Sequence, residues 1–342
     1  MHAAGGERSD ARVWGALGIV YVLWGSTYLG MAVVVETIPA FLGMGTRFAL
    51  SAAILAALVA VLRGPRALVI PRSEIAWAAL IGVMLLVFGN GVVALSEQYV
   101  PSGIAALVVA ITPVVVAALR RATGDTPSAA TTAGVIVGFV GVAALVVVSS
   151  RRTGSMGVGY EDVSEFATLL WTLLIVCAAI SWAVGSFVSS RLSRARALPG
   201  DPLVMTFWQF LAGAAGLLLM GAVTGERMPP VTDWGTRATV AWLFLVAAGV
   251  LAFLSYTWLL ANARLSLVAT YAYVNPLVAV ILGWWIKGET VTPAVVACAA
   301  LVLFGVALVV RGEQGPGRPR EPRSTVEDRA SGPAIGTEGG GP

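Results

Sequence analysis

The stretch Gly141-Val142-Ala143-Ala144-Leu145-Val146-Val147 has a shorter counterpart in Gly305-Val306-Ala307-Leu308-Val309-Val310. Each stretch closes a run of five apolar segments, and each segment is long enough to form a helix that crosses a bilayer. A motif that returns at the end of two similar runs indicates a duplicated unit. The sequence therefore predicts a tandem repeat embedded in a membrane.

The composition agrees with this prediction. Hydrophobic residues make up 58% of the 342 residues and charged residues only 12%, whereas soluble proteins carry about a quarter charged residues. A bilayer core about 30 Å thick needs about 20 apolar residues in a helix. Ten such segments are predicted, at 13–35, 39–62, 74–97, 102–120, 128–149, 168–191, 203–223, 237–260, 266–286 and 293–311.

These segments define the predicted domains. The first half spans 13–150 and the second 168–310, and an extracytoplasmic linker, 151–167, joins them. A cytoplasmic tail, 1–12, precedes the first apolar segment. This segment is longer than the hydrophobic region of a signal peptide, so we expect it to be retained in the mature protein. The tail 311–342 is rich in Gly and Pro and poor in apolar residues, which predicts disorder.

The basic residues are distributed unevenly between alternate loops. With the N-terminus in the cytoplasm, sixteen arginines lie on the inner side and five basic residues on the outer side. The outer ones are Arg151, Arg152, Arg227, Arg237 and Lys287. Because Lys and Arg are enriched in loops that stay in the cytoplasm, both termini are predicted to be cytoplasmic. Topology therefore accounts for the net charge of +4, and a nucleic-acid partner is not expected.

Landmarks recur in the same order in the two halves. The matched pairs are Trp24 with Trp182, Arg47 with Gln209, Pro113 with Pro276 and Gly141 with Gly305. Their separations drift slowly, as small loop insertions in a duplicated unit would cause. Because five is an odd number, the second half must enter the membrane upside down. The predicted fold class is an all-α integral membrane protein of ten transmembrane helices in two inverted five-helix repeats, an architecture typical of secondary transporters.

Five short motifs occur in order along the chain. They are Leu23-Trp24-Gly25-Ser26-Thr27-Tyr28, Gly89-Asn90-Gly91, Val100-Pro101-Ser102-Gly103-Ile104-Ala105-Ala106, Tyr271-Ala272-Tyr273-Val274-Asn275-Pro276 and Gly288-Glu289-Thr290. In these motifs the chain, over about 13–310, resembles EamA permeases of the drug/metabolite transporter superfamily, with its nearest likeness to the YedA-like branch. The resemblance implies a ten-helix transporter of the bacterial inner membrane. It does not imply a substrate, because one such scaffold serves amino acids, metabolites and drugs.

Two charged residues in the first half are candidates for transport roles. Arg47 lies well inside a segment, where a charge costs about 2.5–3.5 kcal/mol, so it should face the bundle or a wet cavity. There it can anchor a substrate carboxylate or phosphate, or form a structural pair with Glu97. Glu97 is a candidate for proton coupling, since desolvation near the membrane alters the protonation of an acid. Its alternative is an interfacial, solvated position.

Two prolines suggest broken helices. Pro113 and Pro276 occupy mid-segment positions, where proline removes a backbone hydrogen bond, and broken helices line cavities in transporters. Thr112 and Asn275 precede them. For the segment with Tyr271, Tyr273 and Asn275, the alternative is a simple kink with packed aromatic rings. The other predicted substrate-binding residues are polar or aromatic. They are Trp24, Ser26, Thr27, Tyr28, Asn90, Trp182, Ser255, Tyr256, Tyr271 and Tyr273.

We interpret the chain as an exporter of small polar metabolites such as amino acids, working by alternating access. Efflux of lipophilic drugs or cations is the alternative, and a membrane enzyme acting on lipid carriers is a remote third. The chain has no Walker loop, so gradients or exchange must supply the energy. Neither a cofactor nor a metal is expected, because the single histidine is His2 and both cysteines lie in apolar segments. The expected partners are a small molecule and the bilayer, for a monomer or homodimer.

Overall fold

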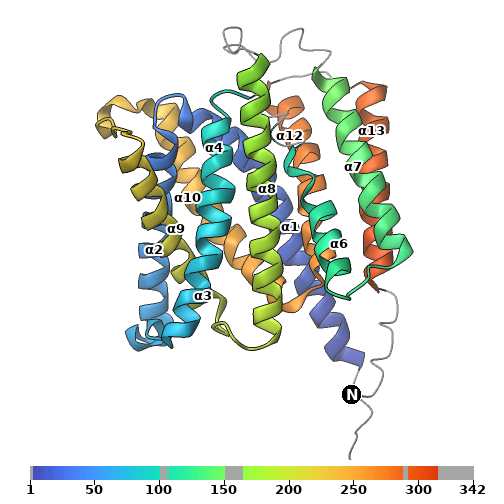
Figure 1. Cartoon of the computed structure of the whole chain (residues 1–342), viewed down its shortest axis with the longest axis horizontal. Coiled ribbons are helices and arrows are strands. Elements are labelled where there is room, and N and C mark those ends of the chain that lie inside the picture. Colours follow the sequence, from blue (N-terminus) through green and yellow to red (C-terminus); the bar gives the residue numbers. More distant parts are fainter. Residues whose placement is uncertain (1–2, 101–104, 106–107, 151–164, 288–291, 315–342) are drawn as a thin grey trace, which may run out of the picture.

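The computed structural model describes residues 3–100, 105, 108–150, 165–287 and 292–314. Within these residues it is built from helices, without a strand (Figure 1). The long helices are α1 (Ala3–Val35), α2 (Ala40–Arg63), α7 (Ala129–Ser150), α8 (Glu165–Arg194), α9 (Pro202–Val223), α10 (Gly235–Asn262), α12 (Tyr271–Lys287) and α13 (Pro293–Gln314). The shorter elements are η1 (Pro65–Leu68), α3 (Arg72–Gly82), η2 (Val83–Gly91), α4 (Val92–Ser96), α6 (Thr112–Ala122), η3 (Val231–Asp233) and α11 (Leu265–Ala269).

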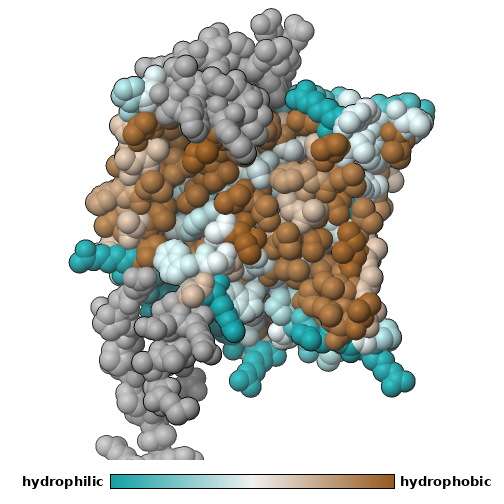
Figure 2. All heavy atoms as spheres, turned by 180° about the vertical axis from the view of Figure 1, so that it is seen from behind, coloured by the Kyte–Doolittle hydropathy of each residue, from teal (hydrophilic) through white to brown (hydrophobic). Residues whose placement is uncertain are grey.

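Length and composition identify the helices that can cross a membrane. Seven spans qualify among the described residues: Ala11–Val35, Ala40–Arg63, Arg72–Ser96, Leu169–Arg194, Pro202–Val223, Gly235–Asn262 and Pro293–Glu313. Figure 2 shows apolar side chains forming a broad band between more hydrophilic ends, which is the surface that a bilayer would cover. The chain is therefore an all-helical, multi-pass membrane protein.

The three remaining predicted segments are also helical where the structure describes them. The segment 128–149 corresponds to α7, and 266–286 is divided between α11 and α12 at Thr270. Only the second part of 102–120 is described, as α6. Pro113 lies in the first turn of α6 rather than in mid-helix, and there the missing N–H of proline costs no helical hydrogen bond. Pro276 does lie inside α12.

Helix ends differ from the prediction at both tails. α1 already begins at Ala3, inside the predicted N-terminal tail. α13 continues through Arg311 to Gln314, because Glu313 in its last turn is 6% exposed and pairs with Arg120 at 2.6 Å. The rest of the predicted C-terminal tail and most of the linker 151–167 lie outside the described residues.

The most extensive contacts join helices that are far apart in sequence. α7 packs along α13, α2 along α9, and α1 along α10 and α12, while α8 packs on the continuous helix formed by α3, η2 and α4. Figure 1 shows α7 and α13 side by side at one edge of the bundle. The two halves of the chain are therefore interleaved rather than separate.

Small residues allow the α7 and α13 backbones to touch. A Cβ atom added at Gly134 would lie 2.6 Å from the carbonyl oxygen of Gly305, and one at Gly141 would lie 2.9 Å from the Val302 nitrogen. A Cβ at Gly138 would lie 2.6 Å from the Tyr273 ring. The first glycine of each repeated stretch, Gly141 or Gly305, thus lies against the partner helix at the tightest kind of helix interface used in membranes.

The third span, Arg72–Ser96, contains a π-helix near its centre. Residues 83–91 form the π-helix η2, which continues from α3 and leads into α4 without a break. A π-helical turn accommodates an extra residue and shifts the side chains that follow it, and such turns are frequent at functional sites. Asn90 lies in this π-helix.

Candidate functional site

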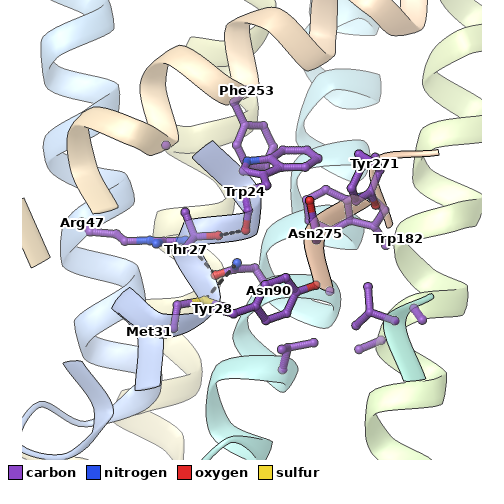
Figure 3. Close-up of a pocket in the computed structure, with 16 residues that line it drawn as sticks. Trp24, Thr27, Tyr28, Met31, Arg47, Asn90, Trp182, Phe253, Tyr271 and Asn275 are labelled. Carbon is purple, nitrogen blue, oxygen red and sulfur yellow. Dashed lines mark hydrogen bonds between the residues drawn. The ribbon is translucent and has the colours of Figure 1, made fainter. Parts of the chain in front are cut away.

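A cavity of about 60 Å³ lies inside the bundle, between helices of both halves. Its lining includes eight of the predicted substrate-binding residues: Trp24, Thr27, Tyr28, Arg47, Asn90, Trp182, Tyr271 and Asn275 (Figure 3). Its volume is enough for roughly four water molecules. In this conformation the cavity is too small for an amino acid, so a substrate of that size requires the helices to move apart.

Arg47 provides the charge of the cavity. Its side chain comes from α2, is 3% exposed, and donates through Nη2 to Asn90 Oδ1 at 2.9 Å. The Nε and Nη1 atoms are buried and make no hydrogen bond within the part of the chain that the structure describes. A buried guanidinium with donors to spare is a strong site for an anionic group, since charge-assisted hydrogen bonds are stronger in a dry environment.

Asn90 holds Arg47 in place from the neighbouring helix. Its Oδ1 accepts from Arg47, and its Nδ2 donates weakly to Met31 Sδ at 3.5 Å. Both partners line the cavity, and Figure 3 shows them meeting on the same side of it. A hydrogen bond to a residue of η2 therefore helps to hold the guanidinium in place.

Glu97 lies close enough to affect the charge of Arg47. It follows α4 directly, is 3% exposed, and interacts electrostatically with Arg47. Burial of the side chain contradicts the solvated position that was the alternative from the sequence. The predicted direct pair is not among the ion pairs shorter than 4.0 Å between described residues. Arg47 instead contacts Asn90, which lies between the two charges in sequence.

Aromatic rings form the opposite wall. Trp24 packs edge to face against Trp182, Phe253 and Tyr271, with ring centroids 5.3, 5.4 and 4.9 Å apart. Such geometry places the positive edge of one ring against the negative face of another and fixes both. These rings therefore pack against one another as one wall, and Figure 3 shows Trp24, Phe253 and Trp182 gathered around the cavity.

The broken ninth segment supplies a second polar corner. Tyr271 and Asn275 are four residues apart on α12, so they share a face, and both line the cavity. Asn275 is 3% exposed, and its Oδ1 makes no hydrogen bond to other described residues. The site thus combines unused donors on Arg47 with an unused acceptor on Asn275.

Five predicted residues lie outside the cavity lining. The Ser26, Thr112 and Ser255 hydroxyls donate to backbone carbonyls three or four residues earlier in the chain. The Tyr256 hydroxyl lies behind the aromatic wall, within 2.6 Å of Ser186 Oγ and 3.1 Å of Trp182 Nε1. Tyr273 points away and donates to the Val135 carbonyl at 2.8 Å, against α7. Alternate residues of α12 therefore serve different surfaces.

Several lining residues were missed because they are apolar or small. They are Met31, Gly89, Val93, Val109, Ala178, Ala179, Gly249 and Phe253. Polar and aromatic type was the signal used for prediction, and these residues, Phe253 apart, lack it. Helical spacing could have found some of them, since Ala178 lies one turn before Trp182 and Phe253 one turn after Gly249. Among the residues that the structure describes, no group of three or more side chains could hold a metal ion.

Comparison with known proteins gives consistent results. The model of the EamA-like transporter family matches twice, at residues 13–147 and 169–311. The inner membrane transporter YedA of Escherichia coli K12 is 32% identical over 88% of this chain and 91% of its own. Protein PagO of Salmonella typhimurium is 25% identical over 85% of this chain and 90% of its own. A solved crystal structure, 20% identical, superposes with a TM-score of 0.69 over 89% of this chain and 98% of that one, which shows the same fold.

Proposed function

The chain belongs to the EamA-like transporter family, and from this premise we propose that it exports small polar metabolites such as amino acids by alternating access. The central cavity is the substrate site in this proposal. Export proceeds from the cytoplasm across the inner membrane, with both termini on the cytoplasmic side. No step requires ATP, since the driving force is a gradient or an exchanged solute.

The arrangement of Arg47 and Asn275 is the observation that carries the proposal. Arg47 offers two buried donor nitrogens, Nε and Nη1, to a carboxylate, and Asn275 Oδ1 offers an acceptor to an ammonium group. Trp24 and Tyr271 also line the cavity, and aromatic rings attract cations. A zwitterion carries both charges on one small molecule, so it matches both corners of the cavity.

The contact pattern supports an inverted repeat. If the segments of the first half correspond in order to those of the second, the pair α1 and α10 is equivalent to the pair α8 and η2, and both pack together. The contact of α1 with α12 is likewise equivalent to that of α8 with α6. α2 packs on its own counterpart α9, and α7 on α13. A two-fold relation between the halves accounts for all of these pairs, and the two matches of one family model fit it.

Lipophilic cations are the second candidate class. The aromatic wall supports them, because Trp24, Trp182 and Tyr271 present large apolar surfaces. Arg47 opposes them, since a buried positive charge repels a cation in a medium of low dielectric constant. Because of the charge of Arg47, zwitterions are better candidate substrates than lipophilic cations.

A binding test separates the two classes. The purified protein in detergent is titrated with amino acids and, separately, with lipophilic cations, and its melting temperature is recorded, because ligands that bind only the folded state raise it. We expect amino acids to raise the melting temperature of the wild type and of the control Arg63→Gln, whose side chain is exposed and outside the cavity. Arg47→Gln should lose this effect.

Two outcomes would refute the proposal. One is stabilisation of the wild type by lipophilic cations alone. The other is an amino-acid response that survives in Arg47→Gln. If Arg47→Gln proves too unstable to purify, counterflow in proteoliposomes with Asn275→Leu tests the opposite corner of the same cavity.

A further inference from the structure

A second and much larger cleft opens at the end of the bundle where α1 begins and α13 ends. It has a volume of about 1100 Å³ and lies between the α6–α7 connection, the C-terminal end of α8, the start of α11 and the last turn of α13. None of its lining residues contributes to the central cavity. The cleft is therefore a separate feature from the proposed transport site.

An ion network whose central pair, Arg120 and Glu313, is buried forms one wall of this cleft. Arg120 donates to Glu313 at 2.6 Å, to Asp125 at 2.9 Å and to the Ser266 hydroxyl. Glu313 is also within 3.5 Å of Arg264. Hydrogen bonding from Arg120 lowers the pKa of Asp125, so this carboxylate stays charged at neutral pH. The network thus uses both carboxylates of the cleft to bind arginines of the protein itself.

Positive charge remains in excess on the other wall. Four arginines but only two carboxylates line the cleft. Arg191 and Arg194, at the end of α8, are exposed and form no ion pair with any described residue. Both arginines interact electrostatically with Asp125, which belongs to the ion network. Ser190, 2% exposed, adds a hydroxyl beside them. These are the groups that recognise phosphate oxygens.

An apolar stripe leads from the bilayer surface into this basic end. Leu173, Cys177 and Ile180 are exposed on α8, and Val184, Phe187 and Arg191 follow at the same helical spacing. The stripe therefore runs down one face of α8 and ends where the span Leu169–Arg194 ends. Figure 1 shows α8 extending over the height of the bundle with its lower end beside α6.

We propose that the cleft binds the phosphate headgroup of an anionic phospholipid, with an acyl chain lying along the α8 stripe. Basic pockets between transmembrane helices at the level of the headgroups are suited to this task. The phosphate is held by Arg191 and Arg194, and the hydroxyl of Ser190 supports it. A soluble phosphate ester shares the headgroup chemistry but would make no use of the apolar face that enters the cleft. The bound lipid would bridge α8 and the α6–α7 connection, which come from different halves of the chain.

The test compares lipid retention by two variants of the full chain. The cleft variant is Arg191→Gln with Arg194→Gln. The control is Arg66→Gln with Arg72→Gln, which removes two exposed arginines from outside the cleft. Native mass spectrometry counts bound dioleoylphosphatidylglycerol, with the zwitterionic dioleoylphosphatidylcholine as the lipid control. We expect the wild type and the control variant to retain the anionic lipid, and the cleft variant to bind it at least tenfold more weakly.

Equal retention by the wild type and the cleft variant, or an equal loss in the control variant, would overturn the proposal. So would equal affinity of the wild type for the two lipids. A parallel thermal-shift series with glycerol 3-phosphate identifies the source of the phosphate. Stabilisation by this soluble ester but not by phosphatidylglycerol would show that the site serves solution anions instead. If the double variant does not fold, Arg194→Gln alone is compared with Arg72→Gln.

Discussion

Arg47 and Glu97 bring two buried charges into one region of the bundle, each 3% exposed. A proton bound to or released from Glu97 changes the electrostatic potential at Arg47 and therefore the affinity for an anionic substrate group. We accordingly expect Glu97→Gln to abolish transport driven by a pH gradient while solute exchange at equal pH continues. Flux of a substrate into proteoliposomes, with and without the gradient, measures both. Glu36→Gln, at an exposed position, is the control, and unchanged pH dependence in Glu97→Gln would exclude a coupling role.

Glu226 is a residue whose importance is structural. It lies between α9 and α10, yet its carboxylate accepts from the Leu42 amide at 2.8 Å and the Phe41 amide at 3.2 Å. It therefore caps the N-terminus of α2 from the other half of the chain, where a negative charge is favourable. We expect Glu226→Ala to lower the unfolding free energy by about 1 kcal/mol. Denaturant unfolding in detergent should show this loss, whereas the nearby exposed Asp233→Asn should show almost none.

The α7–α13 pair is the element most sensitive to side-chain size. Because the backbones touch at Gly138 and Gly305, a larger side chain must push the helices apart. We expect Gly305→Leu to destabilise the protein by about 1–3 kcal/mol, as overpacking does. The control is Gly18→Leu on α1, where an added Cβ would meet nothing within 4 Å. Thermal unfolding in detergent compares them, and equal stability would show that the helices can separate at no cost.

The two faces of α12 give a second test at the level of elements. Asn275 lines the cavity, whereas Tyr273 is 0% exposed and contacts α7. In a chain lacking Cys177 and Cys298, we expect Asn275→Cys to react with a small water-soluble thiol reagent and Tyr273→Cys to stay unreactive. Mass spectrometry after labelling measures both. Similar labelling of the two positions would mean that α12 rotates or that the cavity is not reached by water.

For the molecule as a whole, the bias of basic residues predicts the orientation in the membrane. Sixteen arginines lie on the side assigned to the cytoplasm and five basic residues on the other. We expect reporters fused to either terminus to be active in the cytoplasm and inactive in the periplasm. A reporter inserted between residues 151 and 164 should give the reverse pattern. Activity of a terminal fusion in the periplasm would invert the topology.

Most of the helical pattern could be predicted, because apolar length is a local property that the sequence displays directly. Breaks were harder to place, since Pro276 is accommodated within α12 while the chain actually breaks at Thr270. For the site, residue type was a good guide to Arg47 and Asn90 but a poor one to Ser26 and Tyr273. Those depend on which way a helix faces, and that is decided by packing between distant segments. The ion network of Arg120 with Glu313 was likewise hidden, because its members are 193 residues apart.

The interleaving of the halves also affects how the protein is made. α1 packs mainly against α10 and α12. α1 ends at Val35, and α10 begins 200 residues later, at Gly235. At about 5–20 residues per second, the ribosome needs roughly 10–40 s to synthesise that interval. During this time α1 is already in the bilayer, with its buried face covered by lipid or by insertion machinery instead of its final neighbours. The first half of the nascent chain must therefore remain partly assembled until the second half has been synthesised.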